Sequence, residues 1–429
     1  MYSSAKKELG GSLRREEKRM PSTQSTNGAA SKNMRLLGHH DLHGFGNGGE
    51  GLALQQTHDG RRVLYIAHES APKNFSVVEV TDPTAPHLLV QTDLPHQNMR
   101  SNSLDAVGDL LAVAYQTARP GLQPAGVELF DISDPANPRS ITLFDRSGPH
   151  SRGTHCLWFV DGAYIHMSSG APDFVPTFPK DDQFYTIVDV RNPSQPEEVG
   201  RWWLPGTRQG DDVPPPVRHE RLDSGFRPHN TNVYPERPDR AYVGYIDGGI
   251  VILDIADKSQ PKLISRLDYH PPLPGFTHTV LPLFEPGLLI VTDEATRPAG
   301  EDWPKLAWVV DASVETHPMI VGSLPLPPKE EFTPRGGRFG AHNIHENHPL
   351  PTAFRSDTLV FGAFFNGGIR VYDVSNPFHP DEVGYYVPSA PPGSRVGAIQ
   401  MNDVYVDENR VIYAIDRISG GLYILELTI

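Results

Sequence analysis

Cysteine is almost absent from this sequence. Cys156 is the single cysteine among 429 residues, so the chain can form neither an internal disulfide nor a metal site built on paired cysteines. Long apolar runs are missing too: none approaches the roughly 18 residues that cross a bilayer. The charged start MYSSAKKELGGSLRREEKRM also lacks the apolar core of a signal peptide. We therefore expect a cytoplasmic protein with no membrane partner.

Basic charge is scarce as well. The 38 lysines and arginines are outnumbered by 52 aspartates and glutamates, which gives a net charge of −14. This sign disfavours contact with a phosphate backbone, so we expect no nucleic-acid partner. Glycine (39) and proline (42) are abundant instead, and because both interrupt regular helices, the composition predicts short strands joined by many turns.

One pattern recurs along most of the chain. Residues 1–31 are polar, lack apolar periodicity and are predicted to form a flexible leader. After them, an alternating apolar strand repeatedly ends in an acid, and a proline follows seven residues later. The acids of the complete copies are Glu79, Asp131, Asp189, Asp254, Asp311 and Asp373, and a truncated seventh copy has Glu426. A spacing of 52 to 65 residues indicates propeller blades, in which a repeated acid has a structural role.

Each repeat divides into four short strands. In the clearest copy these are HNTNVYP, RAYVGYI, GIVILDI and PKLISRL. The last repeat lacks its fourth strand, but MRLLGHHDLHG at 34–44 matches PEEVGRWWLPG at 196–206 and is expected to supply it. The sequence thus predicts an all-β fold in which residues 32–429 form one seven-bladed β-propeller of four-stranded antiparallel blades. Its N-terminal strand would close the last blade and leave no open sheet edge.

The acid-containing strand and its Asp-Pro-x-x-Pro turn, as in VELFDISDPANP, resemble the LVIVD-repeat β-propellers. The resemblance extends over about residues 32–429 and implies the propeller fold. It implies little about function, because propellers include enzymes, binding modules and scaffolds.

A column of polar residues marks the predicted axis. Alignment of the seven innermost strands places one residue of each blade in this column: Glu50, Asn102, His155, Asn230, His278, Asn343 and Gln400. A core-facing column would be apolar, so the pattern predicts the lining of a water-filled mouth. His345, two residues deeper, adds a third inward imidazole to those of His155 and His278. Strand parity turns His229 and His342 away from the axis and makes them lower-ranked ligands.

Three convergent imidazoles can bind a transition metal ion. An all-nitrogen set suits Fe, Cu or Zn, and Glu50 would complete or orient the site. Alternatively, these side chains only join the blade ends by hydrogen bonds around a water-filled channel. The acids that follow the second strands on the same face, Glu69 and Glu294, are the candidates for catalytic proton transfer.

Arginines gather just before the polar column. Arg100, Arg152 and Arg227 would suit capture of a carboxylate, sulfate or phosphate on a small substrate. The expected polar contacts to that substrate are Asn102, Asn230, Asn343 and Gln400. Loop solubility and ion pairing between blades are the alternative explanation of the arginines.

These residues predict a metal-dependent enzyme, of the oxidoreductase or oxygenase type, acting on a small and preferably anionic molecule at the channel mouth. The axial histidines resemble, in geometry, those of the selenium-binding/methanethiol-oxidase propellers and the carotenoid-cleaving oxygenases. Two alternatives stay open: a non-catalytic interaction scaffold, and a metal-dependent lyase or hydrolase.

Overall fold

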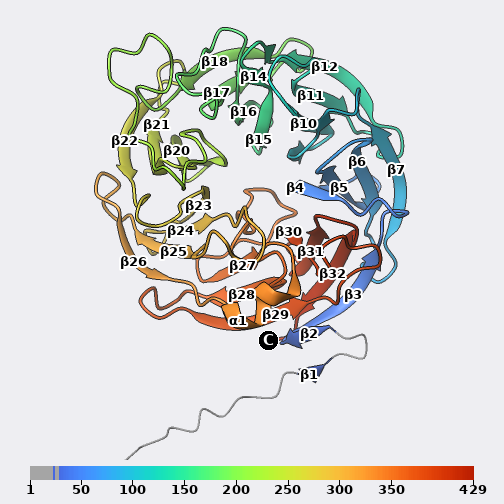
Figure 1. Cartoon of the computed structure of the whole chain (residues 1–429). Coiled ribbons are helices and arrows are strands. Elements are labelled where there is room, and N and C mark those ends of the chain that lie inside the picture. Colours follow the sequence, from blue (N-terminus) through green and yellow to red (C-terminus); the bar gives the residue numbers. More distant parts are fainter. Residues whose placement is uncertain (1–22, 25–28) are drawn as a thin grey trace, which may run out of the picture.

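The computed structural model describes residues 23–24 and 29–429, which form a ring of seven antiparallel blades around a central axis (Figure 1). The prediction of a flexible leader over 1–31 falls largely outside the described residues. The predicted fold class, an all-β seven-bladed propeller of four-stranded blades, is confirmed. Within the described part, no helix is long and apolar enough to cross a membrane.

The first four blades run in order along the chain. Blade one contains β4 (Gly48–Gln56), β5 (Arg62–His68), β6 (Lys73–Glu79) and β7 (His87–Asp93). Blade two contains β8 (Met99–Arg100), β9 (Leu104–Val107), β10 (Leu110–Thr117), β11 (Gly126–Asp131) and β12 (Arg139–Asp145), and the hairpin β13 (Ser147–Gly148) and β14 (Ser151–Arg152) follows it. Blade three contains β15 (Thr154–Trp158), β16 (Tyr164–Ser169), β17 (Phe184–Asp189) and β18 (Glu197–Trp202). Blade four contains β19 (Thr231–Tyr234), β20 (Arg237–Tyr245), β21 (Gly249–Asp254) and β22 (Lys262–Leu267).

The last three blades complete the ring. Blade five contains β23 (Thr277–Leu283), β24 (Leu288–Asp293), β25 (Ala307–Asp311) and β26 (Met319–Ser323). A short helix α1 (Lys329–Phe332) and a 3-10 turn (Thr333–Arg335) lead to blade six, with β27 (Leu359–Ala363), β28 (Ile369–Asp373) and β29 (Asp381–Val387). Blade seven contains β30 (Met401–Val406), β31 (Val411–Asp416) and β32 (Leu422–Leu427). The innermost segment of blade six is irregular and joins β27 through the bridge between Ile344 and Gly362.

The N-terminal segment closes the ring as predicted. β3 (Met34–His40) pairs antiparallel with β32, so the outermost strand of blade seven comes from the other end of the chain. Figure 1 shows this blue strand beside the red ones. The preceding strand β2 (Ala30–Lys32) pairs with β29 and adds a strand to blade six, and β1 (Thr23–Gln24) pairs with β2. The sequence pattern had not indicated this extension.

The repeat motif has a local structural cause. The carboxylate of Asp131 accepts the backbone N–H of Ser133 at 2.9 Å, and the carboxylate of Asp254 accepts that of Ala256 at 2.9 Å. Such Asx turns tie a strand end to the turn that follows it. A glycine in the outermost strand then packs on the turn of the next blade: a Cβ on Gly200 would clash with the carbonyl of Lys258. The acid, the turn and the glycine therefore fix the spacing between adjacent blades.

Candidate functional site

Four buried histidines meet one carboxylate on the axis. The Nε2 atoms of His155, His229 and His278 lie 3.8, 3.7 and 3.7 Å from Oε2 of Glu50. The Nε2 atom of His342 lies 3.6 Å from Oε1 of the same carboxylate. These five residues, called here the axial histidine cluster, come from blades one, three, four, five and six.

The cluster differs in membership from the predicted ligand set. His155 and His278 are in it, but His229 and His342, ranked lower on strand parity, are in it as well. Parity does not hold for these two because His229 precedes the first residue of β19 and His342 lies in the irregular inner segment of blade six. His345 lies elsewhere: its Nε2 is 2.7 Å from the carbonyl of Phe354, and its Nδ1 accepts the backbone N–H of Val406 at 3.2 Å.

Second contacts orient the rings of His155 and His342. The Nδ1 atom of His342 lies 2.6 Å from the carbonyl of Asn402, which can only accept, so this Nδ1 carries the proton. The Nδ1 atom of His155 lies 3.0 Å from Oε1 of Gln116. The Arg100 guanidinium donates to that oxygen at 2.7 Å and thereby fixes the orientation of the Gln116 amide. The same Nδ1 also lies 3.3 Å from the Arg100 guanidinium and 3.4 Å from the amide nitrogen of Asn102, which can only donate, so these contacts do not assign the proton of His155 to one ring nitrogen.

A similar chain orients His229. Its Nδ1 lies 2.8 Å from Oδ1 of Asn230, whose amide nitrogen donates to Glu346 at 2.7 Å. Because the carboxylate of Glu346 holds the Asn230 amide in this orientation, His229 donates from Nδ1. The Nδ1 atom of His278 lies 2.8 Å from the hydroxyl of Thr279. Partners of this kind commonly orient metal-binding histidines.

The inward nitrogens are poorly satisfied by protein atoms. The Nε2 atoms of His278 and His342 are buried and have no hydrogen-bond partner among the described residues. The Nε2 atoms of His155 and His229 face each other at 2.7 Å, and His229 carries its proton on Nδ1. Burial lowers the pKa of His229 to about 3 and that of His155 well below its usual value, so these rings stay neutral. Four convergent imidazole nitrogens suit a transition metal ion.

Two ionised carboxylates, those of Glu50 and Glu294, give this site negative charge. Burial alone would raise the pKa of Glu50, but the contacts with His278 and His342 hold it well below its usual value. Burial likewise opposes ionisation of Glu294, yet His342 and Arg338 lower its pKa to about 2. The Oε1 atom of Glu294 lies 3.6 Å from Nε2 of His342 and 2.7 Å from the Arg338 guanidinium. Two ionised carboxylates therefore adjoin the four imidazoles.

The other predicted acid and the arginines are mostly paired. Oε2 of Glu69 accepts from Arg100 at 2.6 Å and from Arg417 at 2.9 Å, so Glu69 adjoins the cluster through arginines. Arg152 binds Asp182 at 2.5 Å.

Arg227 donates to Gln183 at 3.1 Å, and its Nε lies 4.0 Å from Asp182. Neither Arg152 nor Arg227 is among the contacts of the axial histidine cluster described above. The acids that engage these arginines are their most immediate electrostatic partners.

The four amide side chains predicted to contact a substrate form hydrogen bonds with other groups of the protein. Asn102 donates to Oε2 of Glu50 at 3.1 Å, and Asn230 belongs to the chain that orients His229. Asn343 donates to the carbonyl of Asn402 at 3.2 Å. Gln400 accepts the backbone N–H of Arg338 at 2.7 Å. Asn102 and Asn230 therefore contact members of the axial histidine cluster, whereas Asn343 and Gln400 contact backbone groups of neighbouring segments.

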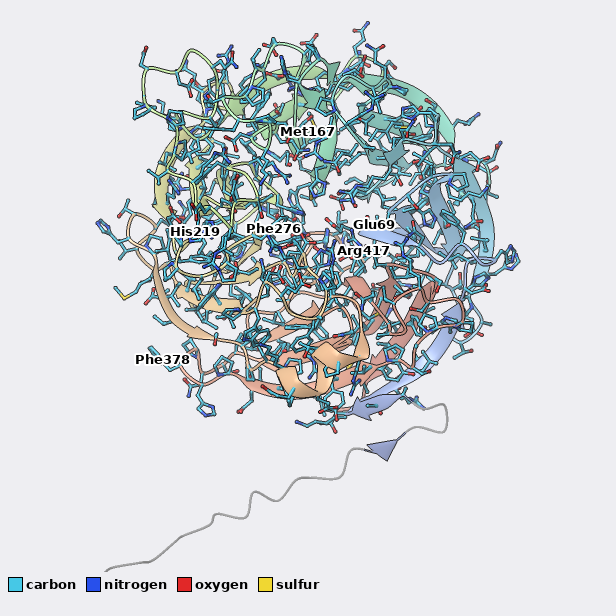
Figure 2. The ribbon with its side chains drawn as sticks, in the orientation of Figure 1. Glu69, Met167, His219, Phe276, Phe378 and Arg417 are labelled. Atoms are coloured by element: carbon cyan, nitrogen blue, oxygen red, sulfur yellow. The ribbon has the colours of Figure 1, made fainter. Side chains whose placement is uncertain are left out.

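A cavity of about 460 Å³ opens beside the cluster. Its wall includes Glu69, Arg338, Arg417 and Arg395. Arg338 contacts Glu294, and Arg417 contacts both Glu50 and Glu69. Figure 2 shows Glu69 and Arg417 near the centre of the ring. Ligands entering from this face would therefore meet guanidinium groups first.

Arg417 is the functional candidate that the sequence reasoning missed. It follows Asp416 at the end of β31, as Glu69 follows His68 in blade one and Glu294 follows Asp293 in blade five. Its guanidinium lies 3.7 Å from Oε1 of Glu50. The position after each second strand was therefore the signal that would have identified it.

Comparisons with known proteins agree on the fold. The family model described as the LVIVD repeat matches residues 181–203, 239–268 and 360–387, in blades three, four and six. No curated protein matches the chain.

Several solved structures share the architecture at low sequence identity. The β-propeller domain of Myceliophteria thermophila Cps50 (Swd1) is 13% identical with a TM-score of 0.51, covering 88% of this chain and 96% of that one. A chain of the mitotic checkpoint complex is 10% identical with a TM-score of 0.54, covering 98% and 99%. The periplasmic gluconolactonase PpgL of Pseudomonas aeruginosa is 11% identical with a TM-score of 0.51, covering 88% of both chains. Identities this low support the fold alone.

Proposed function

This chain is an LVIVD-repeat β-propeller, and from its axial histidine cluster we propose that it is a metal-dependent enzyme of the oxidoreductase or oxygenase type. The carrying observation is the convergence of four buried Nε2 atoms on the Glu50 carboxylate, two of them without a hydrogen-bond partner among the described residues. The cytoplasmic location stays a prediction.

The donor set fits a divalent transition metal ion. His155, His229, His278 and His342 would hold it through Nε2, and Glu50 lies beside all four nitrogens. The charges of Glu50 and Glu294 would together balance a dication. Bound Fe, Cu or Zn would supply Lewis acidity, and Fe or Cu would add one-electron chemistry. The resemblance of the axial histidines to those of the redox propellers named above favours oxidation over hydrolysis.

The surrounding residues would prepare the reaction. Glu294 is ionised and sits 3.6 Å from His342, so it suits the role of proton acceptor at the cavity side of the cluster. Arg338 holds Glu294 in place, and Arg417 joins Glu50 to Glu69. Because Oε2 of Glu69 accepts from both Arg100 and Arg417, and Oε1 lies 2.8 Å from the Arg417 guanidinium, we assign Glu69 a positioning role instead of proton transfer.

Metal retention by the full-length protein tests this proposal. After removal of metal with a chelator, separate samples are loaded with Fe(II), Cu(II) or Zn(II), desalted at neutral pH and measured by elemental mass spectrometry. We expect one ion per chain, and nitrogen hyperfine structure from imidazoles in the electron paramagnetic resonance spectrum of the Cu(II) form. Absence of stoichiometric metal in all three samples would favour the interaction-scaffold alternative.

The cavity beside the cluster supports an anionic substrate. Arg395 lines it and has no ion-pair partner among the described residues, unlike Arg338 and Arg417. A free guanidinium in such a wall suits bidentate capture of a carboxylate. The arginines selected from the sequence are held by acids or amides, so Arg395 is the better candidate for first contact with the substrate.

Citrate is therefore expected to raise the melting temperature of the protein, and Arg395→Ala is expected to reduce this protection. Binding only to the folded state stabilises it by about 1.4 kcal/mol at ten times the dissociation constant. Differential scanning fluorimetry at constant ionic strength measures the effect, with the exposed Arg119→Ala as control. Equal protection of both variants would place the anion outside this cavity.

A further inference from the structure

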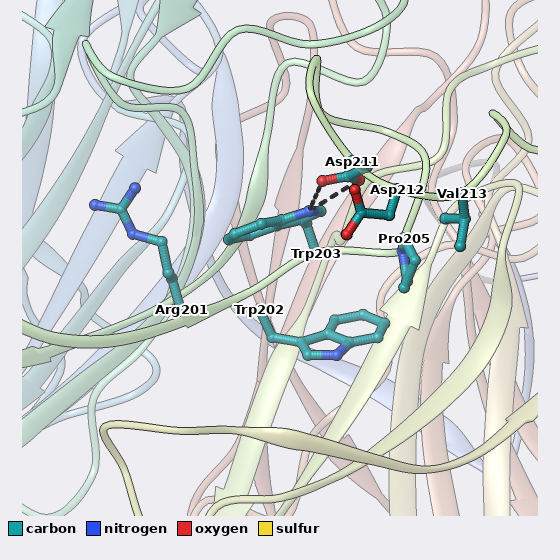
Figure 3. Close-up of a pocket in the computed structure, with 7 residues that line it drawn as sticks. All are labelled: Arg201, Trp202, Trp203, Pro205, Asp211, Asp212 and Val213. Atoms are coloured by element: carbon teal, nitrogen blue, oxygen red, sulfur yellow. Dashed lines mark hydrogen bonds between the residues drawn. The ribbon is translucent and has the colours of Figure 1, made fainter.

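A second cavity, of about 350 Å³, lies at the outer end of blade three, where β18 ends. It shares no lining residue with the cavity beside the axial histidine cluster. Figure 3 shows the residues that line it: Arg201, Trp202, Trp203, Pro205, Asp211, Asp212 and Val213. We call it the tryptophan cavity. Neither the fold nor the proposed metal chemistry explains it.

The two indole rings in its wall are held from behind. The Trp202 ring packs against Tyr245 with 5.6 Å between ring centroids. The Trp203 ring packs against Phe174 and Phe184 at 5.8 and 6.3 Å. Both tryptophans remain only half-buried, so part of each ring faces the cavity. The aromatic walls are therefore in place before any ligand arrives.

The loop that completes the cavity is also held. The carboxylate of Asp211 accepts the backbone N–H of Gly206 at 2.7 Å. It also accepts the indole Nε1–H of Trp203 at 3.2 Å, as Figure 3 shows. The backbone of Thr207 accepts the N–H of Thr177 at 2.7 Å, which ties the loop to the preceding connection. Donation of the indole N–H to a carboxylate also increases electron density in the Trp203 ring, which strengthens its attraction for a cation.

One charged side chain in the wall of the tryptophan cavity has no partner among the described residues. Asp212 is exposed and has no hydrogen-bond or ion-pair partner among the described residues. The neighbouring cations are committed: Arg201 binds Asp173 at 2.9 Å, and the Arg208 guanidinium stacks on Trp203 with 5.1 Å to the ring centroid. The cavity thus combines aromatic surface with one free negative charge.

We propose that the tryptophan cavity binds a quaternary ammonium group. Such a group has no N–H to satisfy, carries a diffuse positive charge and attracts aromatic faces, whereas a primary ammonium needs several acceptors. Asp212 supplies the complementary charge, and Trp202 and Trp203 supply the faces. The group would belong either to a free choline-like molecule or to a trimethylated lysine in a polypeptide.

Calorimetric titration of the full-length protein tests the proposal. The probes are choline, its uncharged isostere 3,3-dimethyl-1-butanol, and a peptide carrying trimethyllysine with its unmodified counterpart. We expect choline to bind about tenfold more tightly than the uncharged isostere, because the ring faces and Asp212 act on charge. We also expect Trp203→Leu to weaken choline binding about tenfold and Asp212→Asn about fivefold.

Glu197→Gln is the matched control, since Glu197 is an exposed acid at the other end of the same strand. It should bind choline as the unchanged protein does. A trimethyllysine peptide that binds tighter than choline, while the unmodified peptide does not, identifies a polypeptide source; binding of choline alone identifies a small molecule. Equal binding of choline and its isostere, or undiminished binding by Asp212→Asn, overturns the proposal, as does the absence of heat with every probe.

Discussion

His278→Ala is expected to remove nearly all bound metal, leaving less than about a tenth of the amount held by the unchanged protein. His278 belongs to both groups of potential ligand atoms that lie within 4.8 Å of one another, one with Glu50 and His229 and the other with Glu294 and His342. Its ring centroid is 3.7 Å from that of His229 and 4.7 Å from that of His342. Loss of this imidazole therefore removes the ligand that both groups share. Elemental mass spectrometry after loading and desalting gives the result.

Further variants distinguish the loss of a metal ligand from the loss of the folded structure. His278→Gln keeps a polar side chain in the buried space and should lose metal while it unfolds cooperatively. His379→Ala changes an exposed histidine in a turn of blade six and should keep one ion per chain. His345→Gln should also retain metal, because the structure places that ring against the backbone of Phe354 and Val406. Loss of metal in His345→Gln with retention in His342→Gln would favour the ligand set inferred from the sequence.

Removal of residues 1–45 is expected to abolish cooperative unfolding, whereas removal of residues 1–28 should leave the unfolding midpoint nearly unchanged. The longer deletion eliminates β3, which pairs with β32 from Met34 opposite Leu427 to His40 opposite Leu422. Unpaired backbone groups at a formerly covered strand cost about 1 to 3 kcal/mol each when they stay buried. Several such groups equal the whole stability of a typical domain, about 5 to 15 kcal/mol. Urea titration followed by circular dichroism measures the difference.

An intermediate deletion, of residues 1–33, removes β2 and leaves β3. It should unfold cooperatively with a modestly lower midpoint, since β2 only extends the edge of blade six. If the deletions to 28 and to 45 unfold at the same urea concentration, ring closure by β3 does not contribute to stability and the closure argument fails.

The fold was predictable because one short sequence motif recurs from blade to blade along the chain. Five of the copies contain an aspartate whose Asx turn shapes the connection, and the recurrence of the pattern along the chain indicated the blade count and the strand order. Closure was predictable because the missing fourth strand of the last copy had a match at 34–44. The pairing of β2 with β29 had no counterpart in any repeat and therefore left no signal.

The site was predictable in its location and less so in its members. Alternation along strands identifies which residues face the axis only where the strand is regular, and His229 and His342 lie where it is not. His345 has the spacing expected of an axis-facing residue, but its ring contacts the backbone of Phe354 and not the axial histidine cluster. The pairing of Arg417 with Glu69 joins blades seven and one, so no local pattern in the sequence reveals it.

The spread of the axial histidine cluster along the chain also sets when it can first exist. Glu50 lies in blade one and His342 in blade six, while the strand that completes blade seven pairs with the last strand of the chain. During synthesis from the N-terminus, Glu50 is made early, and the four histidines that contact it are made later. All five groups are present only once blades one to six have been made, so uptake of the proposed metal ion would follow assembly of nearly the whole ring. A bound metal ion would then indicate that a newly synthesised chain has assembled its ring of blades.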